Sequence, residues 1–353
     1  LYQTENQHGG DVYGGGITLD FSANTNPLGT PPGVLEAVCR ALPRLHRYPD
    51  PYCRRLVQAI AGHEQVPASY ILCGNGAADL IYTYCAALRP RTAVELAPTF
   101  VEYGAGLAQV GCRVERYFLH QAQNFDLDER FLSFLEEKKP EVVFLCNPNN
   151  PTGRLIPLPL LEQILQYCAA QGARLFLDEC FLDLTEDGVS AKSLLAAHPE
   201  LLILKAFTKS YGMAGIRLGY CLCADNALLR RMAAASPPWN VSSPAQSAGV
   251  AALAERDFLQ RTLSLVHTER RWLTDNLTAL GFWVCPSHAN YLLFRGPLGL
   301  REGLLQQGIA IRGCGNYNGL GDGWYRIAVR PHGENEALIT AIRQFCKEKS
   351  LWQ

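Results

Sequence analysis

The sequence has almost no excess of charge and no run of residues suited to crossing a membrane. Of its 353 residues, 32 are Lys or Arg and 33 are Asp or Glu, so the formal net charge is −1. Nucleic acid and anionic membrane surfaces are bound by a concentrated basic field, so neither is an expected partner. The longest uncharged stretch, Met232–Ala254, contains three prolines, which a lipid-spanning helix would not favour. The polar start of the chain lacks the pattern of a signal peptide, so we expect a cytoplasmic protein.

Closely spaced cysteines are also scarce, and the only close pair is Cys221 and Cys223, one residue apart. The 13 cysteines are otherwise scattered singly, without a Cys-x-x-Cys motif or a histidine at zinc-finger spacing from a cysteine pair. A disulfide framework belongs to short secreted chains, so none is expected here, and no metal site is expected either. We interpret the cysteines as small buried apolar residues in a reducing compartment.

Short apolar segments that alternate with helical patterns are abundant. A hydrophobic content of 48% with 18% charged residues excludes disorder and supplies a core for one large or two closely packed domains. We expect strands at Tyr70–Cys73, Ala93–Leu96, Val142–Cys146, Leu175–Leu177, Leu201–Leu204 and Leu218–Cys223. We expect helices at Ala77–Leu88, Arg130–Lys138 and Leu158–Gln171. This alternation predicts an α/β fold with a mainly parallel sheet and its chemistry beyond the carboxyl ends of the strands.

The pattern changes after about residue 240. Helices are expected at Ala245–Ala254, Phe258–Leu280 and Glu334–Lys347, and strands at Tyr291–Phe294, Ile309–Arg312 and Trp324–Val329. We therefore predict a large domain at 45–240 and a smaller α+β domain at 241–353. An N-terminal arm, residues 1–44, is expected to contribute to the small domain and to a substrate site.

Residues with the chemistry of a binding site follow several expected strands. Gly74-Asn75-Gly76 precedes a helix, and such a turn lets backbone N–H groups approach an anion. It lacks the third glycine of a dinucleotide fingerprint, so a nicotinamide site is not expected.

The loop Asn147–Gly153 holds Asn150 rigidly at a strand end. Asp178 ends an apolar strand, where a carboxylate is costly unless it meets a cation. Lys209 lies among small and hydroxyl residues, where burial can lower its pKa as an amine nucleophile needs.

In this order, with Arg217 eight residues after Lys209, these elements resemble the fold type I pyridoxal-phosphate (PLP) enzymes, the aspartate-aminotransferase superfamily. The resemblance spans almost the whole chain, and the Asn150–Gly153 motif and the Lys-to-Arg spacing are its specific parts. It implies an aspartate-aminotransferase-like large PLP-binding domain with a seven-stranded type of sheet, and PLP as cofactor. It also implies a homodimer in which Tyr48 reaches the phosphate bound by the neighbouring subunit.

The resemblance implies a role for each matching position. Lys209 forms the Schiff base with PLP, and Asp178 pairs with the pyridinium nitrogen so that the ring can act as an electron sink. Asn150 bonds the phenolic oxygen of the ring and Phe100 stacks on it. The full set of implied cofactor-binding residues is Gly76, Ala77, Phe100, Asn150, Asp178, Phe181, Thr208, Lys209, Arg217 and Tyr48. Where the family commonly has Ser or Thr three residues before the lysine, this chain has Ala206.

Two groups of enzymes in this superfamily resemble the chain most: the threonine-phosphate decarboxylases of cobalamin biosynthesis and the histidinol-phosphate aminotransferases. His8–Asp11 and Asp20–Gly29 are similar to the N-terminal pattern of the decarboxylases. Phe181 stands where transaminating relatives usually have a tyrosine. The decarboxylases imply conversion of O-phospho-L-threonine into (R)-1-amino-2-propanol phosphate and CO2. A histidinol-phosphate or broader aromatic aminotransferase, a phosphoserine substrate and a non-catalytic PLP-binding regulatory module stay as alternatives.

The resemblance also implies residues that hold a small phosphorylated amino acid. They are His8, Gly9, Asn24, Asn150, Arg312 and Arg326. Guanidinium and imidazole groups suit a substrate that carries both a phosphate and a carboxylate. Arg326 and Arg330 alternate onto one face of an expected strand, and we expect Arg326 to bind the carboxylate.

Overall fold

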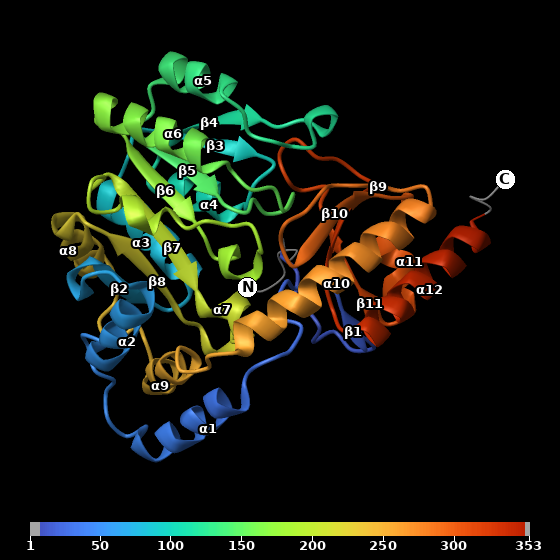
Figure 1. The fold of residues 1–353 in the computed structure, drawn as a ribbon, viewed down its shortest axis with the longest axis horizontal. Coiled ribbons are helices and arrows are strands. Elements are labelled where there is room, and N and C mark those ends of the chain that lie inside the picture. The colour runs from blue at the N-terminus through green and yellow to red at the C-terminus, as the bar shows by residue number, and fades with distance from the viewer. Residues whose placement is uncertain (1–7, 350–353) are drawn as a thin grey trace.

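Seven strands form the central sheet of the computed structural model, which describes residues 8–349 (Figure 1). They are β2 (Ile71–Gly74), β3 (Thr92–Ala97), β4 (Arg113–Phe118), β5 (Val142–Cys146), β6 (Arg174–Asp178), β7 (Leu201–Ala206) and β8 (Gly219–Cys223). Their order across the sheet is β2-β8-β7-β6-β5-β3-β4. Strand β8 runs antiparallel to both of its neighbours, and the other adjacent pairs are parallel. The predicted α/β class with a mainly parallel sheet is therefore confirmed.

Helices cover both faces of this sheet. They are α2 (Arg54–Glu64), α3 (Ala77–Leu88), α4 (Glu102–Gln109), α5 (Arg130–Lys138), α6 (Leu158–Gln171) and α8 (Asn226–Ala235). Alternate residues of strand β5 belong to apolar clusters on opposite faces of the sheet. Val143 and Leu145 belong to the cluster that contains buried residues of α2, α5 and α6, and Phe144 belongs to the cluster of α3, α4 and α8. Because both faces are covered, the inner strands are mostly apolar, and their apolar runs identified them in the sequence.

A second, smaller layer of structure contains the C-terminal part of the chain. Its antiparallel sheet has the order β12-β13-β10-β9. These strands are β9 (Trp283–Val284), β10 (Tyr291–Arg295), β12 (Arg312–Gly313) and β13 (Trp324–Ala328). Three helices accompany it: α10 (Phe258–Ala279), α11 (Leu300–Gln306) and α12 (His332–Glu348). Figure 1 shows the long helix α10 running from the large sheet towards this part.

The N-terminal segment contacts both parts of the molecule. Strand β1 (Leu19–Asp20) pairs in parallel with β11 (Ile309–Ala310), and Phe21 is buried in the apolar cluster of the smaller part. Helix α1 (Pro32–Ala41) instead packs against α9 (Ser243–Ala252), and both contribute residues to a cluster of the large sheet. The boundaries of the domains stay a prediction.

The observed strands differ from the predicted ones in several places, and the two-residue strands β1 and β9 were not predicted. Strand β4 was not predicted, because Arg113–Phe118 is a partly exposed edge strand with charged residues rather than an apolar run. The predicted strand Ile309–Arg312 is two short strands in different sheets, since β11 pairs with β1 and β12 pairs with β13. The chain changes partners at Ile311, and periodicity cannot reveal a change of partner.

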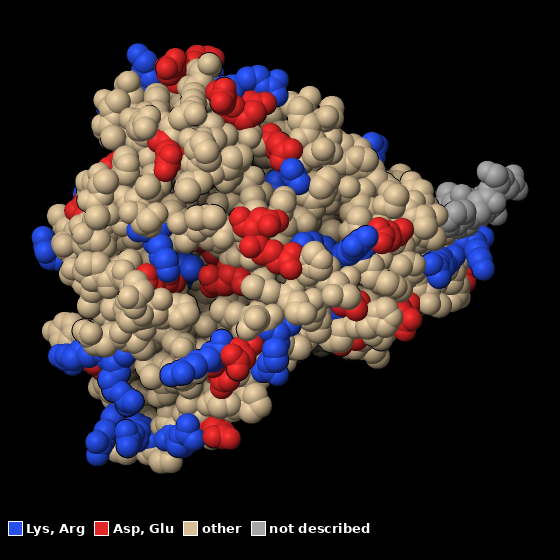
Figure 2. All heavy atoms as spheres, viewed as in Figure 1, with Lys and Arg blue, Asp and Glu red and all other residues tan. Residues whose placement is uncertain are grey.

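The surface carries both signs of charge. On the face in Figure 2, basic and acidic side chains intermingle, and a group of basic side chains lies at the end that α1 occupies in Figure 1. No helix within residues 8–349 is both long and apolar enough to span a membrane. The same residues contain no group of three or more His, Cys, Asp or Glu side chains placed to hold a metal ion.

Candidate active site

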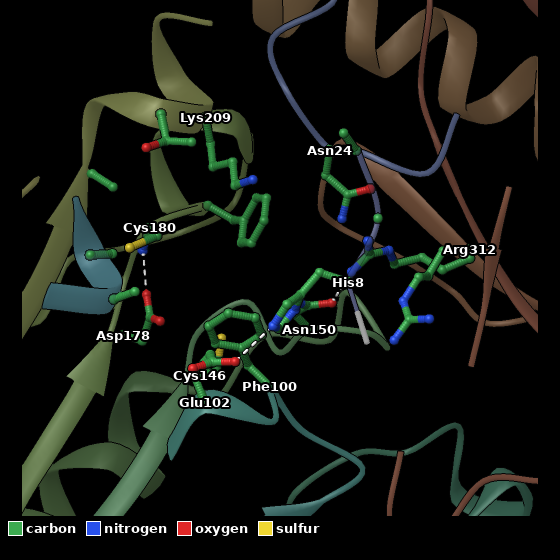
Figure 3. Close-up of a pocket in the computed structure, with 18 of the residues that line it drawn as sticks. His8, Asn24, Phe100, Glu102, Cys146, Asn150, Asp178, Cys180, Lys209 and Arg312 are labelled. Atoms are coloured by element: carbon green, nitrogen blue, oxygen red, sulfur yellow. Dashed lines mark hydrogen bonds and ion pairs between the residues drawn. The ribbon is translucent and has the colours of Figure 1, made fainter. Parts of the chain in front are cut away.

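A cavity of about 450 Å³ lies where the carboxyl ends of β5, β6 and β7 meet the smaller sheet. Figure 3 shows Lys209 and Asp178 on one side and His8, Asn24 and Arg312 on the other. The predicted site residues that line it are His8, Gly9, Asn24, Ala77, Phe100, Asn150, Asp178, Phe181, Thr208, Lys209, Arg217, Arg312 and Arg326. Gly76 directly precedes this lining, and Tyr48 lies elsewhere. A volume of this size suits a small cofactor together with a small substrate.

Lys209 is partly buried and lines this cavity. It lies on α7 (Phe207–Ser210), the short helical turn that follows β7. Its amine lies 5.6 Å from the centroid of the Phe181 ring. Burial lowers the pKa of Lys209 to about 8, and the positive charges of Arg326 and Arg217 lower it further. A larger fraction of this amine is therefore unprotonated near neutral pH than in an exposed lysine, which favours its use as a nucleophile.

Buried polar residues hold the helical turn that carries Lys209. The hydroxyl of Ser210 donates to Oδ2 of Asp183 at 3.0 Å, and Asp183 pairs through Oδ1 with the amine of Lys205 at 2.9 Å. The amide of Asn26 donates to the carbonyl of Ser210 at 2.7 Å. These bonds fix the turn that carries Lys209 relative to β7 and to the N-terminal segment.

Asp178 lies at the end of β6 and is buried. Its Oδ1 accepts the backbone N–H of Cys180 at 2.9 Å, and its Oδ2 accepts the hydroxyl of Tyr103 at 2.6 Å. Burial raises the pKa of Asp178, while the hydrogen bonds from Cys180 and Tyr103 and the charge of Lys209 oppose this rise. Tyr103 was missed by the sequence analysis, because nothing in the sequence joins a tyrosine on α4 to an aspartate on β6.

The N-terminus of α3 and Arg217 form an anion-binding corner. Gly76, with φ +87°, precedes the first residue of the helix, and a Cβ there would lie 2.7 Å from Nη2 of Arg217. Backbone N–H groups at a helix start and a guanidinium together suit a phosphate. Thr208 lines the cavity from α7, two residues after Ala206, which supplies no hydroxyl.

Arg326 is held in the opposite wall of the cavity. This buried side chain donates to Oδ1 of Asn150 and, at 2.9 Å, to the carbonyl of Ser22. With its amide oxygen turned towards the guanidinium, Asn24 accepts from Nε at 3.1 Å. Three neutral acceptors thus orient Arg326 and leave its positive charge without a carboxylate among these partners.

Arg312 lies directly opposite Arg326 in the pairing of β12 with β13. Its Nη2 donates to Asn316 at 2.7 Å, and its guanidinium lies 5.6 Å from the ring centroid of Tyr317, a cavity residue that was not predicted. Like charges directly opposite each other destabilise a sheet. A pair of arginines facing one cavity is therefore suited to an anion that binds between them.

The N-terminal arm covers part of the cavity. Nε2 of His8 lies 2.7 Å from Oε1 of Glu102, and its ring centroid lies 5.9 Å from that of Phe100. A Cβ on Gly9 would overlap the backbone carbonyl of Ser22, so only glycine fits there. Glu102 was not predicted, since a glutamate at the start of a helix is common and has no distinctive pattern around it.

Two predicted features lie outside the cavity. Tyr48 is 79% exposed and stacks on Trp239, with ring centroids 4.5 Å apart. Its role across a subunit interface stays a prediction. Arg330 does not line the cavity, because its Nε is paired with Glu334 at 2.9 Å near the start of α12.

The site has the features that PLP requires. An acid and a lysine lie on one side, an anion-binding corner lies at the start of α3, and an aromatic side chain lines the space between them. Gly76 leaves room that a Cβ would fill against Arg217. The residues present therefore fit a flat aldehyde cofactor that carries a phosphate.

Comparison with known proteins agrees with this geometry. The sequence model of the family described as aminotransferase class I and II matches residues 17–345. The chain is 40% identical over 331 residues to the threonine-phosphate decarboxylase of Salmonella typhimurium, which covers 92% of this chain and 90% of that protein. It is 33% identical over 350 residues to the histidinol-phosphate aminotransferase of Geobacillus sp., which covers 96% and 93%. The solved structure of the histidinol-phosphate aminotransferase from Clostridium acetobutylicum has a TM-score of 0.87 at 28% identity, covering 94% of this chain and 99% of that one.

Proposed function

The chain belongs to the class I and II aminotransferase family, whose cofactor is pyridoxal 5'-phosphate, and from this premise we propose that it decarboxylates O-phospho-L-threonine. The products are (R)-1-amino-2-propanol phosphate and CO2, and the proposed role is in cobalamin biosynthesis. In this reaction the bond between Cα and the carboxylate breaks, CO2 leaves, and a proton takes its place on Cα. The predicted family and cofactor are confirmed.

The observation that carries this proposal is the pairing of Arg312 with Arg326 across two strands that face the cavity. Two guanidinium groups side by side favour a substrate with two anionic groups. Phosphothreonine carries a phosphate and a carboxylate in one molecule, whereas histidinol phosphate carries a phosphate alone and 2-oxoglutarate carries carboxylates alone. His8 and Asn24 from the N-terminal segment line the same side of the cavity. We assign Arg326 to the carboxylate of the substrate, and Arg312 with His8 to its phosphate.

We assign the cofactor to the opposite side of the cavity. PLP, when bound, supplies an electron sink for the pair of electrons that the breaking bond leaves on Cα. Asp178 would hold a proton on the ring nitrogen, because its buried carboxylate gains most from a positive partner. The start of α3 with Gly76 and Ala77, and the side chains of Thr208 and Arg217, would bind the phosphate. Phe100 would cover the ring, and Asn150 would bond its phenolic oxygen.

Lys209 has the properties needed to return a proton to Cα. With a pKa of about 8, its amine can both accept and donate a proton near neutral pH. It lies next to Phe181, which has no hydroxyl to bond the phenolic oxygen of the cofactor. The ring of Phe181 instead packs edge-on against Tyr291, with centroids 5.0 Å apart. The amine therefore has an apolar neighbour on this side of the cavity.

Product identification tests the proposal. The holoenzyme is offered phosphothreonine, phosphoserine and histidinol phosphate in parallel, each with and without 2-oxoglutarate. We expect CO2 and aminopropanol phosphate from phosphothreonine without any keto acid. Transfer of the amino group from histidinol phosphate to 2-oxoglutarate, without release of CO2 from phosphothreonine, would overturn it. That second result would assign the chain to the aminotransferases, to which it is also similar.

We also propose that the enzyme is a cytoplasmic homodimer in which Tyr48 completes the phosphate site of the other subunit. Tyr48 and Trp239 form an exposed aromatic pair beside a hollow lined by Arg40, Arg44 and Arg47. All 13 cysteines are free thiols, as in a reducing compartment. Analytical ultracentrifugation should show a dimer, and replacing Tyr48 with Phe should weaken PLP binding. A monomer with unchanged PLP affinity would contradict the proposal.

A further inference from the structure

We propose that Glu102 is a positioning residue that holds the N-terminal arm over the cavity through His8, and thereby makes the site selective for a phosphorylated substrate. This inference rests on the proposed function, since it concerns the substrate of the same site.

The carboxylate of Glu102 joins three separate elements. Its Oε1 lies 2.7 Å from Nε2 of His8 in the N-terminal arm. Its Oε2 accepts the hydroxyl of Tyr82, on α3, at 2.5 Å. Glu102 itself is the first residue of α4, and its side chain is only 17% exposed. The tyrosine therefore orients one oxygen of the carboxylate, so that the other oxygen points at the imidazole, as Figure 3 shows.

Glu102 places a carboxylate in the wall of a cavity that we propose binds an anionic substrate. Within the described residues, Glu102 and Asp178 are the only carboxylates that line the cavity, and Asp178 faces the cofactor side. The hydrogen bond from His8 holds the pKa of Glu102 below its usual range, so the side chain is ionised at neutral pH. An ionised carboxylate beside an anion-binding site would repel the substrate unless it served another group there. The group that it contacts is the imidazole of His8.

The arm is also tied to the substrate side of the cavity. The N–H of Gly10 donates to the hydroxyl of Ser22 at 2.8 Å. The carbonyl of Ser22 accepts from Arg326 at 2.9 Å. The arm is thus attached at one end to Glu102 and at the other to the segment that orients Arg326. Losing the Glu102 contact would release His8 while leaving Arg326 in place.

A double-mutant cycle between Glu102 and His8 tests this positioning role. Dissociation constants of phosphothreonine and of threonine are measured on the holoenzyme from the absorbance of the bound cofactor, and kcat and KM are measured from CO2 release. Glu102→Ala should weaken phosphothreonine binding about tenfold and leave threonine binding and the cofactor absorbance unchanged. Its kcat should stay within about twofold of wild type, because the reacting atoms are not touched. In a His8→Ala background, the same substitution should change phosphothreonine binding less than about twofold.

Two further variants sharpen the test. Glu102→Gln keeps an oxygen that can accept from the imidazole, so its binding should lie between wild type and Glu102→Ala. Glu141→Ala removes a carboxylate whose partner is Arg91 on the surface, and it should change nothing. Tighter phosphothreonine binding by Glu102→Ala would show a merely repulsive carboxylate and overturn the inference. An equal loss in the His8→Ala background would overturn it as well. Failure of the proposed function is seen separately, as a wild-type enzyme that releases no CO2.

Discussion

Replacing Tyr103 with Phe removes one hydroxyl, which bonds Asp178 and also contacts the thiol of Cys146. The hydroxyl donates to Oδ2 of Asp178 at 2.6 Å in a wholly buried place. The ring packs against Phe100 and Phe144, with centroids 5.6 and 5.5 Å away, and a phenylalanine retains both contacts. The variant therefore changes the electrostatics of Asp178 without creating a cavity around the ring.

The size of the effect follows from the kind of bond that is lost. A hydrogen bond to a charged acceptor stabilises it by about 1.5–3 kcal/mol. That energy favours the ionised form of Asp178, so its loss raises the pKa of this carboxyl further. If the carboxylate charge stabilises the protonated ring of the cofactor in the transition state, kcat should fall by about 10- to 150-fold. Tyr103 acts through Asp178 and so is a positioning residue.

The assay compares this variant with Tyr84→Phe. Tyr84 lies in the same buried aromatic cluster, 5.8 Å from Phe144 between ring centroids, and its hydroxyl has no hydrogen-bond partner among residues 8–349. Its replacement should therefore leave kcat unchanged and should not reduce thermal stability. Decarboxylation rates and the pH dependence of the cofactor absorbance are measured for both holoenzymes. A Tyr103→Phe enzyme within about twofold of wild type, or an equally slow Tyr84→Phe enzyme, would refute the reasoning.

Three further results are expected. Lys209→Ala should abolish both turnover and the visible absorbance of covalently bound cofactor, and retention of either would contradict the role of Lys209. Gly76→Ala should weaken PLP binding in an equilibrium titration, because the new Cβ would lie 2.7 Å from Nη2 of Arg217 at a φ of +87°. The control variant Gly215→Ala should bind PLP normally, because its new Cβ would have no heavy atom within 4 Å. The rate at which apoenzyme incorporates PLP, followed by stopped-flow absorbance, should fall about tenfold per pH unit below the pKa of Lys209, which is about 8, and level off above it. Arg326→Gln removes a positive charge that lowers this pKa, so the profile should move to higher pH, and an unmoved profile would contradict the assignment.

Much of the large sheet could be predicted from the sequence because its strands are buried on both sides. Val142–Cys146, Arg130–Lys138 and Leu158–Gln171 have the predicted bounds, since Pro, Gly and Lys residues punctuate clear apolar patterns there. The same logic failed for Arg113–Phe118, a partly exposed edge strand in which charged and apolar residues are mixed. It also failed at Ile309–Arg312, where hydrogen-bond partners change within a few residues.

The candidate site divides in a similar way. The sequence by itself determined that Asp178, Asn150 and Lys209 would meet, because each follows a strand whose carboxyl end lies at one edge of the sheet. Only the tertiary structure decided which side chains bond the charged groups of the site, such as the carboxylate of Asp178. Tyr103 and Glu102 lie on one helix, and their partners lie 75 residues ahead and 94 residues behind along the chain. Such contacts depend on how helices and the N-terminal arm pack on the sheet, and local patterns of residues carry no record of that packing.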